Sequence, residues 1–107
     1  MDNKKLQELQ FAEQQLSSLH SSLQQLQHQE IEIDSALDAL QTSEDAYEII
    51  GTVMIKKSSS DLQKSLKEKK SFTQKRKKIF EQQEQNLRDQ VKKLQEVVLE
   101  ELDKQQK

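Results

Sequence analysis

The fold of this chain is decided by the stretch Tyr47-Glu48-Ile49-Ile50-Gly51-Thr52-Val53-Met54-Ile55-Lys56-Lys57. β-Branched and apolar residues, which favour strands, surround the only glycine of the 107 residues, and the chain has no proline. Gly51-Thr52 predicts a two-residue turn of type II′, because that turn prefers glycine at its first central position. This turn pairs Ile50 with Val53, Ile49 with Met54, Glu48 with Ile55 and Tyr47 with Lys56. We therefore expect a β-hairpin over residues 46–57.

Both faces of this hairpin carry apolar side chains, and both of its edges are open. An isolated two-stranded hairpin is only marginally stable in water, and an open apolar ribbon pairs readily with other strands. The hairpin is thus predicted to drive oligomerisation. The residues expected to do so are Tyr47, Ile49, Ile50, Gly51, Val53, Met54 and Ile55.

A long helix is predicted on each side of the hairpin, over residues 3–43 and 60–105. In the first helix, steps of three and four residues define the a/d seam of a coiled coil. Its members are Leu9, Ala12, Leu16, Leu19, Leu23, Leu26, Glu30, Ile33, Leu37 and Leu40. Ser58-Ser59-Ser60-Asp61 supplies hydroxyls and a carboxylate that suit the start of the second helix. With so little turn chemistry, the expected architecture is mainly α: one unit over 1–107, with an antiparallel two-helix coiled coil joined by one β-hairpin.

The seam of the second helix is less regular. Its apolar members are Leu62, Leu66, Phe80, Leu87 and Leu94, and the 3–4 spacing places polar residues between them, at Lys69, Thr73, Arg76, Gln83 and Gln90. Phe72 and Ile79 lie on one flank. Glu30 interrupts the first seam, and an antiparallel register places it opposite Lys69 or Arg76. This is either a polar layer that fixes the register or a solvent-exposed position.

Charge is segregated along the chain. Residues 1–50 carry a net charge of −8, residues 51–78 carry +8 and residues 79–107 carry −2. The basic run of residues 64–78 raises the possibility of nucleic-acid binding, but only Phe72 supplies an aromatic ring there. We expect the acids at 30, 32, 34 and 38 to pair with the bases at 64–76 instead.

Composition excludes several classes of protein. The chain is 32% hydrophobic and 34% charged, which is typical of a coiled coil or of disorder; periodic leucines and a net charge of only −2 favour the coiled coil. No cysteine, phosphate-binding loop or catalytic triad is found, and His20 and His28 have no further ligands at metal-binding spacing. We expect no enzymatic activity, cofactor or metal. Neither a membrane-spanning run nor a signal peptide is evident, so a soluble, cytoplasmic protein is expected.

The two chain ends hold more apolar residues than one seam can bury. Val97, Val98 and Leu99 are consecutive and cannot all face the same helix. In a hairpin of helices both ends meet at one tip, so the excess either tightens a fraying end or forms an exposed interaction surface. We expect the surface. The predicted tip residues are Leu6, Leu9, Phe11, Leu16, Val91, Leu94, Val97, Val98, Leu99 and Leu102.

The run from Tyr47 to Lys56 resembles the signature of β-class prefoldin subunits of the archaeal type: a tyrosine, two residues, Val-Gly, then apolar residues ending in lysine. Ile50 stands at the usual valine. Leu66-Lys67-Glu68-Lys69-Lys70 and the run from Phe80 to Leu94 also resemble the second helix of that family.

The resemblance implies an ATP-independent holdase chaperone subunit with no cofactor. In that family the hairpins join those of α-class subunits and further β-class copies in a hexameric β-barrel platform, and the coiled-coil tips hold unfolded client proteins and deliver them to a group II chaperonin. Neither nucleic acid nor membrane is an implied partner. The alternative, from another class, is a structural coiled-coil adaptor that binds one folded partner.

Overall fold

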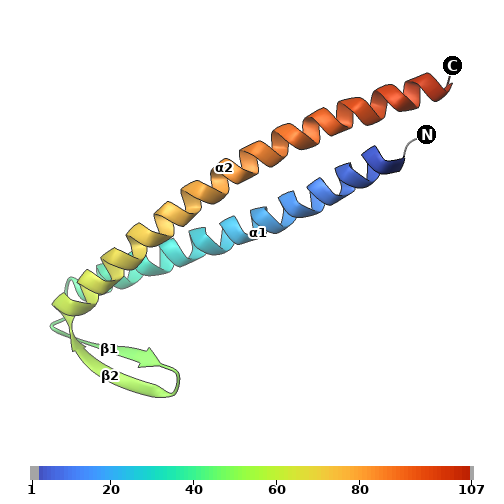
Figure 1. Cartoon of the computed structure of the whole chain (residues 1–107). Coiled ribbons are helices and arrows are strands. Elements are labelled where there is room, and N and C mark those ends of the chain that lie inside the picture. Colours follow the sequence, from blue (N-terminus) through green and yellow to red (C-terminus); the bar gives the residue numbers. More distant parts are fainter. Residues whose placement is uncertain (1–2, 107) are drawn as a thin grey trace. The chain divides into compact units, whose positions relative to one another are not determined.

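The computed structural model describes residues 3–106, which form two helices and two strands (Figure 1). Helix α1 spans Asn3–Leu40, strand β1 spans Asp45–Ile50, strand β2 spans Val53–Ser58, and helix α2 spans Ser59–Gln106. The order helix, hairpin, helix confirms the fold class expected from the sequence.

The hairpin has the expected turn and register. Gly51 has φ of 62°, and among the described residues no other residue has a positive φ. A positive φ at the first central position followed by a negative φ at Thr52 is the pattern of a type II′ turn. The strands pair antiparallel, with Ile50 opposite Val53, and the register runs out to Asp45 opposite Ser58. The ribbon is one residue longer at each end than residues 46–57.

Helix α1 ends at Leu40, three residues before the expected end at Ser43, because the carbonyl group at its end accepts hydrogen bonds from outside the helix. The Leu40 carbonyl accepts hydrogen bonds from Ser59 Oγ at 2.7 Å and Gln63 Nε2 at 3.1 Å, both from the start of α2. The amide of Ser43 donates to the Leu40 carbonyl at 3.4 Å, which is a turn contact. These bonds satisfy a helix end whose carbonyls lack partners within the helix.

Helix α2 begins at Ser59, one residue earlier than expected, and continues to Gln106. Ser58 Oγ accepts a hydrogen bond from the Asp61 amide at 3.2 Å, as an N-cap side chain does. The Asp61 carboxylate lies in the first turn, where the helix dipole favours negative charge. Ser59 itself is buried, with its amide donating to the Glu44 carbonyl at 3.2 Å. The serine run thus both starts α2 and closes the end of α1.

The backbone divides into two compact units. Of the described residues, 3–24 and 78–106 form the terminal unit, and Gln25–Lys77 form the hairpin unit. Each contains one segment of α1 and one of α2, and the hairpin unit also contains both strands. The expectation of a single unit over 1–107 includes residues 1–2 and 107, which lie outside the described residues, and it stays a prediction.

The core of the terminal unit is a layer of side chains between its two helix segments. Leu9, Ala12, Val91, Leu94 and Val98 are buried together, with Leu6 and Leu16 packed against them. Fully burying such a leucine or valine stabilises a fold by roughly 1.5–3 kcal/mol.

In the hairpin unit the buried apolar residues are Leu26, Ile33, Leu40 and Leu62. Every seam position predicted for α1 is buried or half-buried across the two units, so that seam is confirmed.

The seam predicted for α2 is wrong at four of its polar positions. Lys69, Arg76, Gln83 and Gln90 are exposed, whereas their successors Lys70, Lys77 and Glu84 are half-buried and Val91 is buried. Thr73, with 4% of its surface exposed, does lie in the seam. After Leu66, the buried and half-buried positions of α2 follow one another at intervals of four and then three residues, whereas the predicted seam has intervals of three and then four. Lysine suits such positions because its aliphatic stem packs while its ammonium reaches water.

Candidate interaction surfaces

The first candidate surface is the hairpin ribbon, whose apolar side chains have no cover within the chain. Each of the seven residues predicted to drive oligomerisation is exposed; Ile49 is 69% and Met54 is 64% exposed. Side chains alternate between the faces of a strand, so the pair Ile49–Met54 lies on one face and the pair Ile50–Val53 on the other. Near the open end, ion pairs join Lys56 to Asp45 at 3.5 Å and Lys57 to Glu48. The ribbon is therefore apolar toward its turn and charged toward its base.

The ribbon also has two free edges. The described sheet has only two strands, in the order β1-β2, so the outer side of each strand presents unpaired N–H and C=O groups. Such an edge binds another strand through main-chain hydrogen bonds. Apolar faces and open edges together make this part of the chain suited to pairing with other strands.

The second candidate surface is on the terminal unit, and the ten residues predicted for the tip divide into two groups there. Six belong to the buried or half-buried seam: Leu6, Leu9, Leu16, Val91, Leu94 and Val98. Four are exposed: Phe11 at 62%, Val97 at 36%, Leu99 at 62% and Leu102 at 38%. Val97 and Leu99 flank the buried Val98, so they lie on opposite sides of the seam. These four can contact another molecule without opening the helices.

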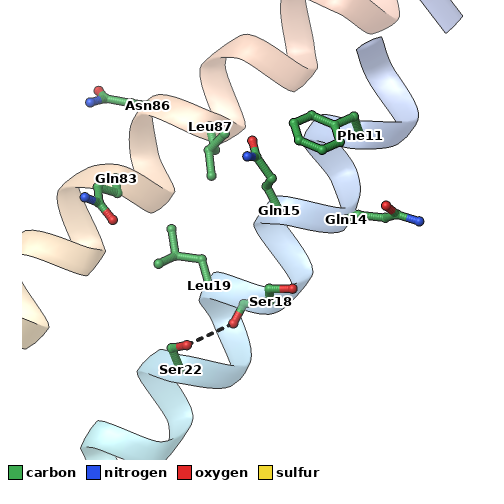
Figure 2. Close-up of a pocket in the computed structure, with 9 residues that line it drawn as sticks. All are labelled: Phe11, Gln14, Gln15, Ser18, Leu19, Ser22, Gln83, Asn86 and Leu87. Atoms are coloured by element: carbon green, nitrogen blue, oxygen red, sulfur yellow. Dashed lines mark hydrogen bonds between the residues drawn. The ribbon is translucent and has the colours of Figure 1, made fainter. Parts of the chain in front are cut away.

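An open groove of about 740 Å³ runs along one side of the terminal unit (Figure 2). Leu19 from α1 and Leu87 from α2 point toward one another across it, and Phe11 lies further along α1. The remaining lining residues are polar but uncharged: Gln14, Gln15, Ser18, Ser22, Gln83 and Asn86. The groove is thus apolar along its floor, with amides and hydroxyls at its rims.

The groove includes two residues, Leu19 and Leu87, that sequence reasoning placed only in the seam. Both are half-buried, so each contributes to the packing and to the groove floor at once. The absence of charge at residues 14–22 of α1, apart from His20, is the sequence signal that could have located this surface.

A smaller recess of about 360 Å³ in the same unit has the opposite chemistry. Glu13, Leu16, Ser17, His20, Glu84 and Arg88 line it. Arg88 Nη2 lies 2.8 Å from Glu84 Oε1, and His20 Nδ1 lies 3.8 Å from Glu84 Oε2. The terminal unit therefore has one uncharged side and one charged side.

In the hairpin unit, two of the four acids expected to pair with the bases at 64–76 meet bases of α2, and one of those two bases, Lys77, lies just beyond that range. Asp34 Oδ1 lies 2.6 Å from Lys70 Nζ, and Glu30 Oε2 lies 3.6 Å from Lys77 Nζ. The hydrogen bond that Lys70 donates to the Asp34 carboxylate, reinforced by the charges of Asp34, Glu30 and Asp38, raises the pKa of Lys70 above its ordinary value. Glu30 is half-buried, and it faces Lys77 and Gln74, not Lys69 or Arg76, because the seam of α2 is shifted by one residue. Glu32 pairs with His28 of the same helix at 3.0 Å.

Among residues 3–106, no three histidine, cysteine or carboxylate side chains gather as a metal site would require. Within the same range, neither α1 nor α2 is both long and apolar enough to span a bilayer.

These features define a class of protein: a coiled-coil chain in which, within residues 3–106, two long helices are joined by one β-hairpin. Comparison with known families gives the particular one, because residues 3–105 match the prefoldin subunit family. The chain belongs to that family, and it is therefore a chaperone-type subunit that assembles with other prefoldin subunits.

Structural comparison agrees with this assignment. The chain is similar to the prefoldin beta subunit from Thermococcus strain KS-1, with a TM-score of 0.81 and 27% sequence identity over 92% of this chain and 89% of that chain. The mainly helical fold with one two-stranded hairpin is that of the prefoldin beta subunit. Comparison with curated protein sequences gives no match.

Proposed function

We propose that this chain is a β-class subunit of a hexameric holdase, and that it assembles through its hairpin with α-class subunits and further copies of itself. The observation that supports the assembly role is the exposure of apolar pairs on both faces of a ribbon with two free edges. Strand addition at those edges would cover the pairs Ile50–Val53 and Ile49–Met54 and satisfy the open backbone groups. The assembly works in the cytoplasm and hydrolyses no ATP.

In this proposal the terminal unit binds non-native client proteins. The client contacts are made by Phe11, Val97, Leu99 and Leu102, together with the floor of the uncharged groove at Leu19 and Leu87. The six seam residues of the predicted tip hold the helices together and contribute to client binding only in that way. Contacts that are weak at one subunit become useful when several subunits of one platform hold the same chain, because each further contact is intramolecular. The assembly then passes its client to a group II chaperonin.

The test is suppression of aggregation by the assembled protein. In the surface variant, Phe11, Leu99 and Leu102 are replaced by serine, which removes exposed apolar area and leaves the seam intact. We expect this variant to assemble normally and to lose most of its ability to keep a chemically denatured test protein from scattering light. The matched control is Ile31→Ser, which removes a side chain that is equally exposed, at 63%, in the hairpin unit.

Two outcomes would contradict the client-binding proposal. If the surface variant protects as well as the unmodified assembly while Phe72→Ser and Ile79→Ser reduce protection, clients bind on the flank of α2. If the unmodified assembly protects no unrelated test protein and binds only one folded partner, the chain is a structural adaptor. Truncation after Gln90 is a poorer test, because it also removes Val91, Leu94 and Val98 from the seam and exposes Leu9 and Ala12.

A further inference from the structure

On α2 of the hairpin unit, three cations lie within about one helical turn of an exposed aromatic ring. Phe72 is 62% exposed, and the guanidinium carbon of Arg76 lies 6.0 Å from the centre of its ring. Lys69 precedes Phe72 by three residues and Lys75 follows it by three, so helical spacing brings both toward the ring. We call Lys69, Phe72, Lys75 and Arg76 the cationic patch.

The acids of α1 pair with lysines that adjoin the patch in sequence, and not with Lys69 or Lys75. Asp34 and Glu30 pair with Lys70 and Lys77, each of which directly follows a patch cation and is rotated from it by about 100°. Within the part of the chain that the structure describes, Lys69 and Lys75 make no ion pair. Glu68 is the one acid a single turn from Phe72 on α2. The patch therefore keeps positive charge beside an uncovered apolar ring.

We propose that the cationic patch docks a short acidic segment of a partner protein, one that carries an apolar side chain between its carboxylates. The carboxylates suit the lysine and arginine side chains, and the apolar side chain covers Phe72. This occupant differs from the clients of the terminal unit, whose groove is uncharged. The inference therefore stands independently of client capture.

A nucleic acid suits the patch less well. The hairpin unit as a whole has nine acidic and nine basic residues, so it has no net charge to attract a long polyanion. A nucleic acid extending beyond the patch would also meet the carboxylate of Glu68, one helical turn from Phe72. A single aromatic ring also cannot stack with several successive bases of a nucleic acid.

The test uses a fluorescein-labelled 14-residue helical peptide that has leucine on one face and glutamate beside it. Fluorescence anisotropy measures its binding to the assembled full-length protein. We expect the peptide to bind, and binding to weaken about tenfold with Phe72→Ala and about three- to tenfold with the double variant Lys69→Gln/Arg76→Gln. A peptide with glutamine in place of glutamate should bind as weakly as the original peptide binds the double variant. Binding should also fall in 0.5 M salt.

The matched control is Lys64→Gln/Lys67→Gln, which removes the same charge from exposed positions outside the patch and should leave binding unchanged. All four replaced side chains are exposed, so circular dichroism should stay unaltered in every variant. Equal weakening in the control and patch variants would mean that only total charge matters and would overturn the proposal. So would tighter binding of a single-stranded oligonucleotide than of the acidic peptide, since the patch would then be a nucleic-acid site.

Discussion

The hairpin ribbon and the terminal unit both expose apolar side chains, but they do so in different ways. On the ribbon, Ile49, Ile50, Val53 and Met54 are fixed by a defined strand register beside open backbone edges. On the terminal unit, Phe11, Leu99 and Leu102 stand on helices whose backbone groups are already bonded within the helix. The ribbon can therefore add directional main-chain hydrogen bonds to its apolar contacts, whereas the terminal unit offers side-chain contact alone.

This difference gives the ribbon a means of selecting its partner strand and the terminal unit a means of binding with little requirement for a partner's sequence. Main-chain pairing requires a partner strand in register, and a slip of one residue would turn every side chain to the other face. Apolar side chains on a helix make no such demand, because contact energy depends mainly on buried area. Under the proposed function, the ribbon serves assembly with matching subunits and the terminal surface binds varied clients.

The largest effect is expected when the ribbon loses its apolar character. Replacing both Ile50 and Val53, which lie opposite one another, with aspartate would place two carboxylates in any strand-paired interface. We expect complete loss of assembly in analytical ultracentrifugation, with helical circular dichroism largely retained in the released chains. The matched control is Asp45→Asn at the charged base of the ribbon, which should assemble normally. An intact oligomer in the double variant would disprove assembly through the ribbon.

A smaller effect is expected at the turn, and it depends on backbone geometry alone. A Cβ at Gly51 would meet no atom within 4 Å, but φ of 62° is costly for a β-branched residue. Gly51→Val should therefore weaken assembly by roughly 1–3 kcal/mol, read from the concentration at which the complex dissociates. Thr52→Val, at the adjacent position with negative φ, should have little effect. Equal effects of the two would contradict the type II′ turn.

Within the terminal unit, variants of Leu94 and Leu99 distinguish the contribution of seam packing to stability from the contribution of exposed surface to client binding. Leu94 is 8% exposed and Leu99 is 62% exposed. Leu94→Ala should cost about 2 kcal/mol or more and lower Tm by about 8 °C or more, because it leaves a cavity in the seam. Leu99→Ala should change stability by less than about 0.5 kcal/mol but reduce protection of clients. Tm and light scattering are compared at one protein concentration. Reversal of the two profiles would mean that the seam itself opens to bind clients.

Sequence alone predicted the hairpin better than the second helix, for a physical reason. The single glycine allows one position for a positive φ, and period-two alternation then fixes every pair from Tyr47–Lys56 to Ile50–Val53. In α2 the seam between Leu66 and Phe80 contains no aliphatic side chain to mark it. Lys69 and Lys70 are adjacent cations, and so are Arg76 and Lys77, so the charge pattern fits two registers equally well.

Val91 and Val98 identify the correct register of the α2 seam. The positions that precede Val91 at intervals of seven residues are Glu84, Lys77 and Lys70. The predicted tip includes both valines, because the spacing of residues 91–102 does not distinguish the buried members of this apolar group from the exposed ones. Burial of Leu9 against the Val91 cluster depends on contact between distant segments, which one-dimensional spacing does not reveal. The groove at Leu19 and Leu87 was missed for the same reason, since it exists only where two helices meet.

The smallest effect is expected from the ion pair that joins α1 to α2 in the hairpin unit. Asp34→Asn removes the partner of Lys70 and should lower Tm by no more than about 4 °C at low salt, and by less in 1 M salt, because exposed pairs are screened. Since the pKa of Lys70 is raised in the fold, the contribution is complete below the lysine pKa of the unfolded chain and is lost as pH rises through the higher folded value. The Tm difference between Asp34→Asn and the unmodified protein should accordingly be constant from pH 7 to 9 and shrink as the pH rises past the ordinary lysine pKa of about 10.4. Glu32→Gln, which affects a pair within α1 only, is the control and should show no such alkaline change. A Tm difference that persists undiminished in both high salt and alkali would show that Asp34 acts through packing and not through its charge.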